Sequence, residues 1–253
     1  MAAAAFFDLD RTLLRRSSTL ALAGTFHQRG LISRSQLAKA AAWQMLFVLR
    51  GASHEAVRRV AEDGLVLLRG FKPEDMRDLV ASAMEPVLRP LVYAEPLRLV
   101  EQHRERGEPV FIVSASLQEI VEAIAEDLGF DGGLGTICEV RDGRYTGRAV
   151  RALHAEGKAA CLREVAGREG LDLAECTAYS DSHTDLPFLE AVGHPVAVNP
   201  DRGLRRIAAD RGWPVLEFSD RAYPHARRRV PPAFIAAGAA GAAALFAARL
   251  RGR

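Results

Sequence analysis

The sequence predicts an α/β fold in which a mostly parallel sheet carries helices on both faces and a helical segment is inserted after the first strand. Three observations predict this fold. Short apolar runs alternate with helical patterns along most of the chain, as in successive βα units. The first apolar run, residues 4–8, ends in an acidic side chain. Residues 17–88 then contain helix signals but no strand signal.

The individual elements follow from the apolar periodicity and from turn residues. Strands are expected at 4–8, 109–114, 134–138, 176–180, 196–199 and 215–218, and helices at 117–128, 156–169, 184–191 and 202–211. Asp142 and Gly143 separate two short strand-like segments and predict a β-hairpin. Because βα alternation places helices on both faces of a sheet, most strands should be parallel and buried.

Three regions are expected along the chain. Residues 1–14 and 93–220 would form the core, residues 15–92 a helical cap inserted into it, and residues 221–253 a basic and hydrophobic C-terminal tail. Within the cap, Ser33 and Gln36 have the spacing of a capping box, and Pro73 is placed to open another helix. The cap therefore reads as about four helices.

The tail contains an Ala/Gly-rich run without charge at residues 230–248, bounded by arginines. As a hydrophobic helix it would span roughly 28 Å, at the lower edge of bilayer thickness. One hypothesis is a single membrane helix that attaches the protein to the inner face of a membrane. The alternative is a loosely packed or interfacial helix.

Composition bounds the classes of function. Of the 253 residues, 49% are hydrophobic and 26% are charged, which is typical of a soluble globular protein. Three widely spaced cysteines argue against a disulfide framework or a zinc knuckle and favour a reducing, cytoplasmic setting. The net charge is +2, and removing the seven arginines from residue 221 onward leaves −5 for residues 1–220. A mildly acidic body gives no reason to expect a nucleic-acid partner.

Acidic side chains follow the first strand. Asp8 and Asp10 are separated by one residue directly after the apolar run, so both should lie at the edge of the sheet. One carboxylate of such a pair can attack phosphorus, while the other, kept protonated by its neighbour, gives a proton to the leaving group. Alone, the same pattern is also typical of a turn or a helix cap.

Two further elements suit phosphate binding. Ser114 ends the apolar strand at 109–114, where a hydroxyl and the amides of a following helix can contact a phosphate oxygen. The alternative is that Ser114 or Ser116 only caps that helix. Lys158 is one of three lysines among 34 basic residues, and its ammonium can sit on a phosphoryl oxygen. An ordinary surface lysine is the alternative.

A second acidic pair, Asp181 and Asp185, follows the strand at 176–180. Carboxylate oxygens without nearby cysteine are ligands for a hard cation such as Mg²⁺, although a helix cap would use the same residues. The four elements occur in an order that lets strand tips and following helices form one pocket. Together they supply what phosphoryl transfer needs: nucleophile, proton donor, phosphate contacts and metal ligands.

These motifs resemble the haloacid dehalogenase superfamily, in particular its phosphoserine phosphatase-like subfamily IB hydrolases. The resemblance covers about residues 4–218 and rests on Asp8 to Thr12, Ser114, Lys158 and the pair of Asp181 with Asp185. It implies a Rossmann-like core with a C1-type helical cap. It also implies a Mg²⁺-dependent phosphatase that cleaves a small phosphate ester.

The resemblance implies a role for each matched residue. Asp8 would be the nucleophile that becomes phosphorylated, and Asp10 the general acid and base. Ser114, Lys158 and Thr12 would bind the phosphate, and Thr12 would also brace the turn after the nucleophile. Mg²⁺ would be held by Asp8, by the carbonyl of Asp10 and by Asp181, with Asp185 supporting the metal site.

The sequence departs from phosphoserine phosphatases in three places. Arg11 stands where a small residue is usual, and Thr184 where asparagine is common. Residues 13–20 contain no carboxylate that could read the amino group of phosphoserine. We therefore expect a phosphomonoester other than phosphoserine, and a substrate with extra negative charge is one option. The alternatives are a catalytically idle phosphate-binding scaffold on this fold, or a membrane-tethered lipid-phosphate phosphatase.

Overall fold

The computed structural model describes residues 2–30, 32–33, 35 and 64–223. Its strands are β1 (Ala5–Phe7), β2 (Val110–Leu117), β3 (Gly132–Arg141), β4 (Arg144–Arg151), β5 (Thr177–Ser180), β6 (His194–Val198) and β7 (Val215–Leu216). The helices are α1 (Ser18–Gln28), α4 (Pro73–Ala83), α5 (Ala94–Glu105), α6 (Gln118–Leu128), α7 (Glu156–Glu169), α8 (Leu186–Glu190) and α9 (Arg202–Arg211). Three short helical turns are η1 (Met84–Leu88), η2 (Arg89–Leu91) and η3 (His183–Asp185).

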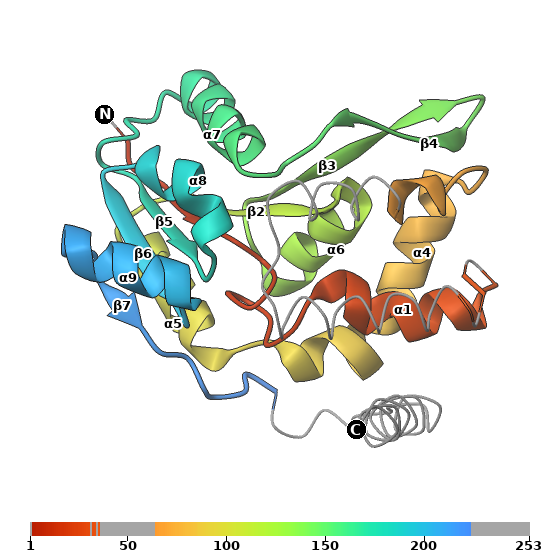
Figure 1. The fold of residues 1–253 in the computed structure, drawn as a ribbon, viewed down its shortest axis with the longest axis horizontal. Coiled ribbons are helices and arrows are strands. Elements are labelled where there is room, and N and C mark those ends of the chain that lie inside the picture. The colour runs from red at the N-terminus through yellow and green to blue at the C-terminus, as the bar shows by residue number, and fades with distance from the viewer. Residues whose placement is uncertain (1, 31, 34, 36–63, 224–253) are drawn as a thin grey trace, which may run out of the picture.

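The strands form one seven-stranded sheet in the order β4-β3-β2-β1-β5-β6-β7. All neighbouring pairs are parallel except β3 and β4, which are antiparallel. β1 lies in the middle, with Phe6 opposite Phe111 of β2 and Ala178 of β5. The predicted mostly parallel sheet is confirmed, and its central strand is the one that ends just before Asp8 (Figure 1).

Helices cover both faces of this sheet because successive residues of a buried strand point to opposite sides. Phe7 belongs to an apolar cluster that includes Ile112, Tyr179 and residues of α1, α4, α5 and α6. Phe6 belongs to a second cluster with Phe111 and residues of α7, α8 and α9. Both phenylalanines are fully buried, so truncating either to alanine would cost about 3–5 kcal/mol.

The segment between β1 and α5 leaves and re-enters the core at one place. Leu14 and Val92 form an antiparallel bridge. Arg15 N donates to Leu91 O at 2.8 Å, and Tyr93 N donates to Leu13 O at 3.0 Å. In this segment α1 and α4 pack against each other and against η1. The prediction that Pro73 opens a helix is confirmed, whereas the Ser33–Gln36 capping box falls partly on Gln36, outside the described residues. The bounds of the cap stay a prediction.

Several elements differ from the sequence prediction in length. β2 continues to Leu117 instead of ending at Ser114, because Leu117 still pairs with Thr136 beyond an irregularity in register. The helix expected at 184–191 is divided into η3 and α8, with Pro187 in the first turn of α8. α7 and α9 have the expected bounds. Pairing with neighbouring strands therefore extends β2 through residues whose small side chains suggested a helix start.

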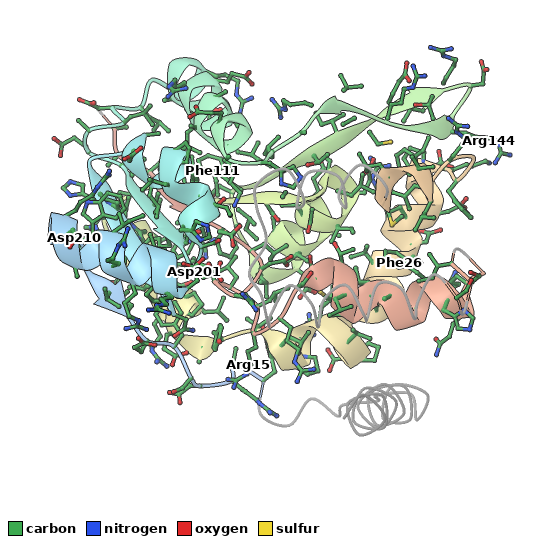
Figure 2. The ribbon with its side chains drawn as sticks, viewed as in Figure 1. Arg15, Phe26, Phe111, Arg144, Asp201 and Asp210 are labelled. Atoms are coloured by element: carbon green, nitrogen blue, oxygen red, sulfur yellow. The ribbon has the colours of Figure 1, made fainter. Side chains whose placement is uncertain are left out.

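The predicted hairpin is confirmed. Asp142 and Gly143 connect β3 to β4, both with positive φ (52° and 71°), which suits the twist of paired strands. The hairpin also contacts the segment before α4, since Tyr145 N donates to Phe71 O at 2.8 Å. Figure 2 shows Arg144 of this hairpin and Asp210 of α9 at opposite ends of the molecule.

The predicted C-terminal helix at 230–248 lies outside the described residues. Within the part of the chain that the structure describes, no helix is both long enough and apolar enough to cross a membrane. Membrane attachment through the tail therefore stays a prediction.

Candidate active site

Asp8 lies at the C-terminal end of the central strand. Its backbone N donates to the carbonyl oxygen of Tyr179 at 2.9 Å, which continues the pairing of β1 with β5. The aromatic rings of Phe7 and Tyr179 stack at 4.3 Å between centroids just below it. Asp8 is only 6% exposed. A carboxylate is thus delivered to the C-terminal edge of a parallel sheet, where such sheets bind ligands.

The chain turns sharply after Asp8, and the turn fixes Asp10. Leu13 N and Leu14 N both donate to Leu9 O, at 3.0 and 2.9 Å. Arg11 has a φ of 67°, the left-handed region that favours small residues, so an arginine here is unusual. Oδ1 of Asp10 accepts a 2.7 Å hydrogen bond from Ser18 N at the start of α1. The first helix therefore orients the second carboxylate.

Thr12, predicted to brace this turn, is fully buried. Its Oγ1 has no hydrogen-bond partner among the described residues. A buried hydroxyl without a partner is costly unless something else satisfies it. Thr12 is therefore placed inside the turn, and its predicted contact with phosphate stays a prediction.

Lys158 reaches the site from the first turn of α7. The helix can begin there only because residue 157 is glycine: a Cβ would lie 2.1 Å from the carbonyl oxygen of Ala152. Nζ of Lys158 lies 2.6 Å from Oδ1 of Asp8 and 2.6 Å from Oδ2 of Asp185. Its side chain is 3% exposed. Lys158 is therefore a buried cation shared by two acids, not a surface lysine.

Asp181 and Asp185, the two acids that follow β5, lie in different environments. Oδ2 of Asp185 accepts hydrogen bonds from Lys158 and from Ser180 Oγ, the latter at 2.7 Å. Asp181 has a weaker cationic partner, with its Oδ2 3.9 Å from Nη1 of Arg11. Both aspartates are buried. Of these two acids, Asp181 therefore has the weaker compensation of its charge.

The pKa shifts follow from this arrangement. Burial raises the pKa of Asp8 to about 7, although the Lys158 charge opposes the rise. Burial, together with the charges of Asp8 and Asp185, raises the pKa of Asp181 well above its ordinary value. Burial alone would lower the pKa of Lys158, but the charges of Asp185 and Asp8 raise it, so the ammonium stays protonated. The site therefore holds more buried acid than its cations neutralise.

Burial also raises the pKa of Asp10, while hydrogen bonds from Ser18 partly oppose the shift. An acid with a raised pKa keeps its proton to higher pH, which suits a proton donor. The two acids after β1 therefore have different partners, Lys158 for Asp8 and Ser18 for Asp10.

Ser114 lies inside β2 rather than at a helix start. It is 2% exposed, and its Oγ accepts a 3.1 Å hydrogen bond from Ser116 N. Ser116 Oγ in turn lies 2.9 Å from Ser18 Oγ, which joins β2 to α1. No hydrogen bond links Ser114 to Asp8 or Lys158 in the part of the chain that is described. The structure thus joins Asp8, Lys158 and Asp185 directly, whereas Ser114 is hydrogen-bonded within its own strand.

The donor chemistry fits Mg²⁺. Mg²⁺ in proteins is bound by one or two carboxylates, with water and substrate phosphate completing its shell. Asp8 and Asp181 are both buried, and the charge of Asp8 contributes to the raised pKa of Asp181. A divalent cation would relieve this excess of negative charge. Among the described residues no group of three or more His, Cys, Asp or Glu side chains is arranged to hold a metal ion. A metal site made of two carboxylates and a backbone carbonyl does not need such a group of three side chains.

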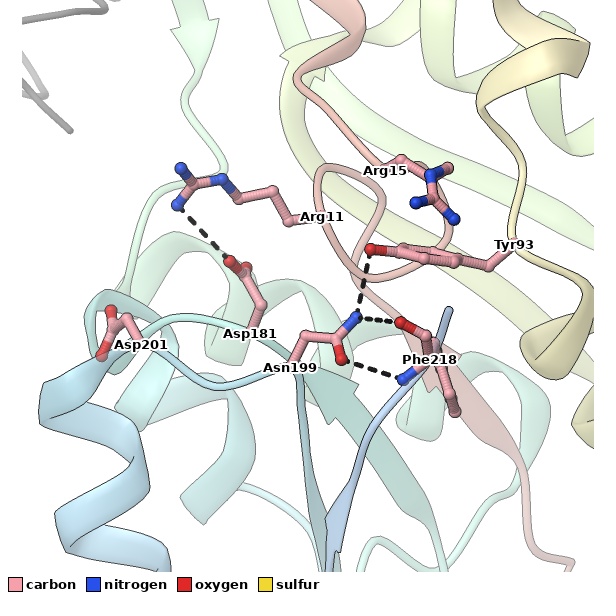
Figure 3. A pocket seen from close by; sticks show the side chains of 7 residues that line it. All are labelled: Arg11, Arg15, Tyr93, Asp181, Asn199, Asp201 and Phe218. Atoms are coloured by element: carbon pink, nitrogen blue, oxygen red, sulfur yellow. Dashed lines mark hydrogen bonds and ion pairs between the residues drawn. The ribbon is translucent and has the colours of Figure 1, made fainter. Parts of the chain in front are cut away.

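A cavity of about 380 Å³ opens beside Asp181. It is lined by Arg11, Arg15, Tyr93, Asp181, Asn199, Asp201 and Phe218 (Figure 3). Of these residues, the sequence predicts only Asp181 as a site residue. The others come from the segments that follow β1, β6 and β7 and from the segment before α5. Their residue types do not indicate that these segments meet in the folded chain.

Ser180 and His183 also lie at this edge. Ser180 directly precedes Asp181, so the motif itself could have drawn attention to it. Nδ1 of His183 lies 2.8 Å from Oδ2 of Asp201, and this contact connects the segment after β5 to the N-cap of α9. His183 therefore helps to hold the segment that contains Asp181 and Asp185 in place.

The geometry agrees with a family comparison. The model of the haloacid dehalogenase-like hydrolases matches residues 5–190, which include Asp8, Ser114, Lys158 and both late aspartates. The chain belongs to the haloacid dehalogenase-like hydrolase family. The predicted family is therefore confirmed.

Relatives within this family carry phosphatase names. A probable phosphatase of Mycobacterium tuberculosis is 45% identical over 216 residues, covering 85% of this chain and 75% of the relative. A phosphoserine phosphatase of the same organism is 36% identical over 263 residues, covering 100% of this chain and 82% of the relative.

Solved structures agree on the fold. A protein of unknown function from Bordetella pertussis has a TM-score of 0.74 and 31% identity, covering 85% of this chain and 98% of that one. A phosphoserine phosphatase described as a phospho-aspartyl intermediate analogue has a TM-score of 0.62 at 18% identity, covering 87% of this chain and 95% of that one. The second likeness shows the haloacid dehalogenase fold alone.

Proposed function

We propose that this hydrolase is a Mg²⁺-dependent phosphatase that cleaves a small phosphomonoester through a phosphorylated Asp8. The phosphatase class itself is confirmed by the family and by the names of the relatives. The metal, the intermediate and the role of each residue are the proposal. The observation that carries it is the ammonium of Lys158, which lies 2.6 Å from Asp8. The charge of Asp8 also acts on the buried Asp181, whose own negative charge is only partly balanced by cations.

In the first half-reaction, a carboxylate oxygen of Asp8 attacks phosphorus and the bond to the leaving alcohol breaks. Asp10, whose pKa is raised by burial, donates its proton to the departing oxygen. Lys158 stabilises the negative charge on the phosphoryl oxygens. The products are the free alcohol and an aspartyl-phosphate on Asp8.

In the second half-reaction, water attacks the phosphorus of the aspartyl-phosphate and gives a proton to the ionised Asp10. The bond between Asp8 and phosphorus breaks, which releases phosphate and restores both acids. Ser18 N, 2.7 Å from Asp10 Oδ1, holds the carboxyl in place during both transfers. One residue thus serves as acid and then as base.

Asp8, the carbonyl of Asp10 and Asp181 would hold Mg²⁺, with Asp185 supporting the site through Lys158. When bound, the ion supplies charge neutralisation and orientation of the phosphoryl group. We also propose that residues 15–92 form a cap over the substrate, which would exclude all but one positioned water. Ser114 and Thr12 would contact the phosphoryl group.

The test is a phosphate-release screen over sugar, amino-acid, nucleotide and lipid phosphates, with Mg²⁺ or with a chelator. We expect release only with Mg²⁺, and an acid-quenched sample should carry a phosphoryl adduct on Asp8 by mass spectrometry. Asp8→Asn should abolish both, whereas Asp210→Asn, at an exposed aspartate on α9, should keep both. Phosphate release by Asp8→Asn at the wild-type rate would overturn the mechanism.

A further inference from the structure

The cavity beside Asp181 contains two basic and two acidic side chains. Asp181 belongs to the proposed metal site, so its charge would be directed to the cation. Asp201 is already engaged on both oxygens: Oδ1 accepts from Leu204 N at 2.8 Å, and Oδ2 accepts from His183 N at 3.0 Å. Asp201 thereby caps α9, and these hydrogen bonds and the helix N-terminus partly compensate its negative charge.

The two arginines are less engaged. The side chain of Arg11 is 43% exposed, and its one described ion pair is the 3.9 Å contact with Asp181. Arg15 donates from Nη1 to the carbonyl oxygen of Ser219, and its guanidinium carbon lies 5.1 Å from the centre of the Tyr93 ring. A guanidinium has five N–H donors, so this backbone bond and the ring contact orient Arg15 without using most of them.

The wall of the cavity is held in place by a small network. Asn199 Nδ2 donates to Tyr93 Oη at 3.1 Å and to Phe218 O at 3.2 Å, and Asn199 Oδ1 accepts from Phe218 N at 2.9 Å (Figure 3). Because Tyr93 accepts from Asn199, its own hydroxyl proton remains available to donate to a ligand. Arg15 therefore lies over a ring that hydrogen bonds hold in place, and the Tyr93 hydroxyl is a further hydrogen-bond donor for a ligand.

We propose that this cavity binds a second anionic group of the substrate, a carboxylate or a second phosphate, through Arg15, Arg11 and Tyr93. The inference rests on the proposed function, because it assumes that the phosphoryl group lies at Asp8. Asp181 lines the cavity and is close enough to Asp8 for the two charges to interact, so we expect a substrate held at Asp8 to extend toward the cavity. The substrate class is thus an anionic phosphate ester rather than a neutral alcohol phosphate.

The test compares three terminal phosphate esters: glycerol phosphate, phosphoglycerate and glycerol bisphosphate. They differ in whether the far end carries a hydroxyl, a carboxylate or a phosphate, so the set also tells which anion fits. We expect kcat/KM for at least one of the two anionic esters to exceed that for glycerol phosphate by about tenfold or more, mainly through KM. The advantage should shrink as salt is added.

Arg15→Gln should reduce this preference by about tenfold, and Arg15→Lys should retain part of it. Arg16→Gln is the matched control, because Arg16 is the exposed neighbour and does not line the cavity. Arg16→Gln should leave unchanged the ratio of kcat/KM for the preferred anionic ester to kcat/KM for glycerol phosphate. An equal effect of Arg15→Gln and Arg16→Gln on the ratio overturns the inference.

A binding measurement separates this inference from the proposed function. Titration calorimetry of Asp8→Asn with Mg²⁺ and each ester reports binding without turnover. If no ester is hydrolysed by the wild-type protein but Arg15→Gln removes preferential binding of the anionic esters, the mechanism is wrong and the anion site stands. If the esters are hydrolysed without preference and bind equally, the anion site is wrong and the mechanism stands.

Discussion

The ammonium nitrogen of Lys158 lies 2.6 Å from Oδ1 of Asp8, and 150 residues of sequence separate the two. Both side chains are buried, so each charge depends on the other. Removing one member of a buried ion pair leaves the other charge without compensation in a poorly solvating environment. We therefore expect this ion pair to contribute to stability as well as to the proposed catalysis.

Lys158→Met should lower the free energy of unfolding by about 3–5 kcal/mol, because Asp8 and Asp185 would lose their shared cation. Urea denaturation measures this effect. Arg163→Met, at an exposed position of the same helix, should change stability by no more than about 0.5 kcal/mol. Equal stability of the two variants would show that Lys158 is not a buried counterion.

Asp10→Asn should slow hydrolysis according to the leaving group. An alkyl phosphate needs a proton on the departing oxygen, so its kcat should fall about 10²–10⁴-fold. Nitrophenyl phosphate, with an acidic phenol as leaving group, should lose much less in the first half-reaction, which a burst measurement isolates. The same loss for both substrates in that burst would contradict the role of Asp10 as proton donor.

Mg²⁺ should raise the melting temperature of the protein, because a ligand that binds only the folded state stabilises it. At a concentration 100 times its Kd the gain is about 2.7 kcal/mol. Asp181→Asn should remove most of this gain, while the exposed Asp210→Asn should keep it. Scanning calorimetry with Mg²⁺ and with a chelator measures the difference. A full Mg²⁺ shift in Asp181→Asn would exclude Asp181 as a ligand.

The stability of the metal-free protein should depend on pH through Asp8. Its pKa rises from 3.8 to about 7 on folding, so the folded state favours the neutral acid. This stabilisation is complete below pH 3.8 and is lost as pH rises toward 7. Asp8→Asn cannot ionise and should escape that loss. Its melting temperature relative to wild type should therefore increase by several degrees between pH 4 and pH 8, and a difference independent of pH would contradict the shift.

Most of the fold could be predicted because it depends on local sequence patterns, such as apolar runs and turn residues. The apolar run through Phe6 and Phe7 predicted the central strand, and Asp142 with Gly143 predicted the hairpin. The end of β2 could not be predicted, because Ser114 to Leu117 remain in the strand through pairing with β3. That pairing joins residues distant in sequence, and their small side chains are equally compatible with a helix start.

The sequence by itself determined the family, the α/β architecture and the identity of the acids and the lysine, because their spacing along strands and turns is a local property. Only the tertiary structure decided which groups touch: that Lys158 is shared by Asp8 and Asp185, that Ser18 orients Asp10, and that two arginines share a cavity with Asp181. These contacts join segments far apart in sequence. Their distances and burial, and hence the pKa values, depend on how the sheet and helices pack, which no local pattern specifies.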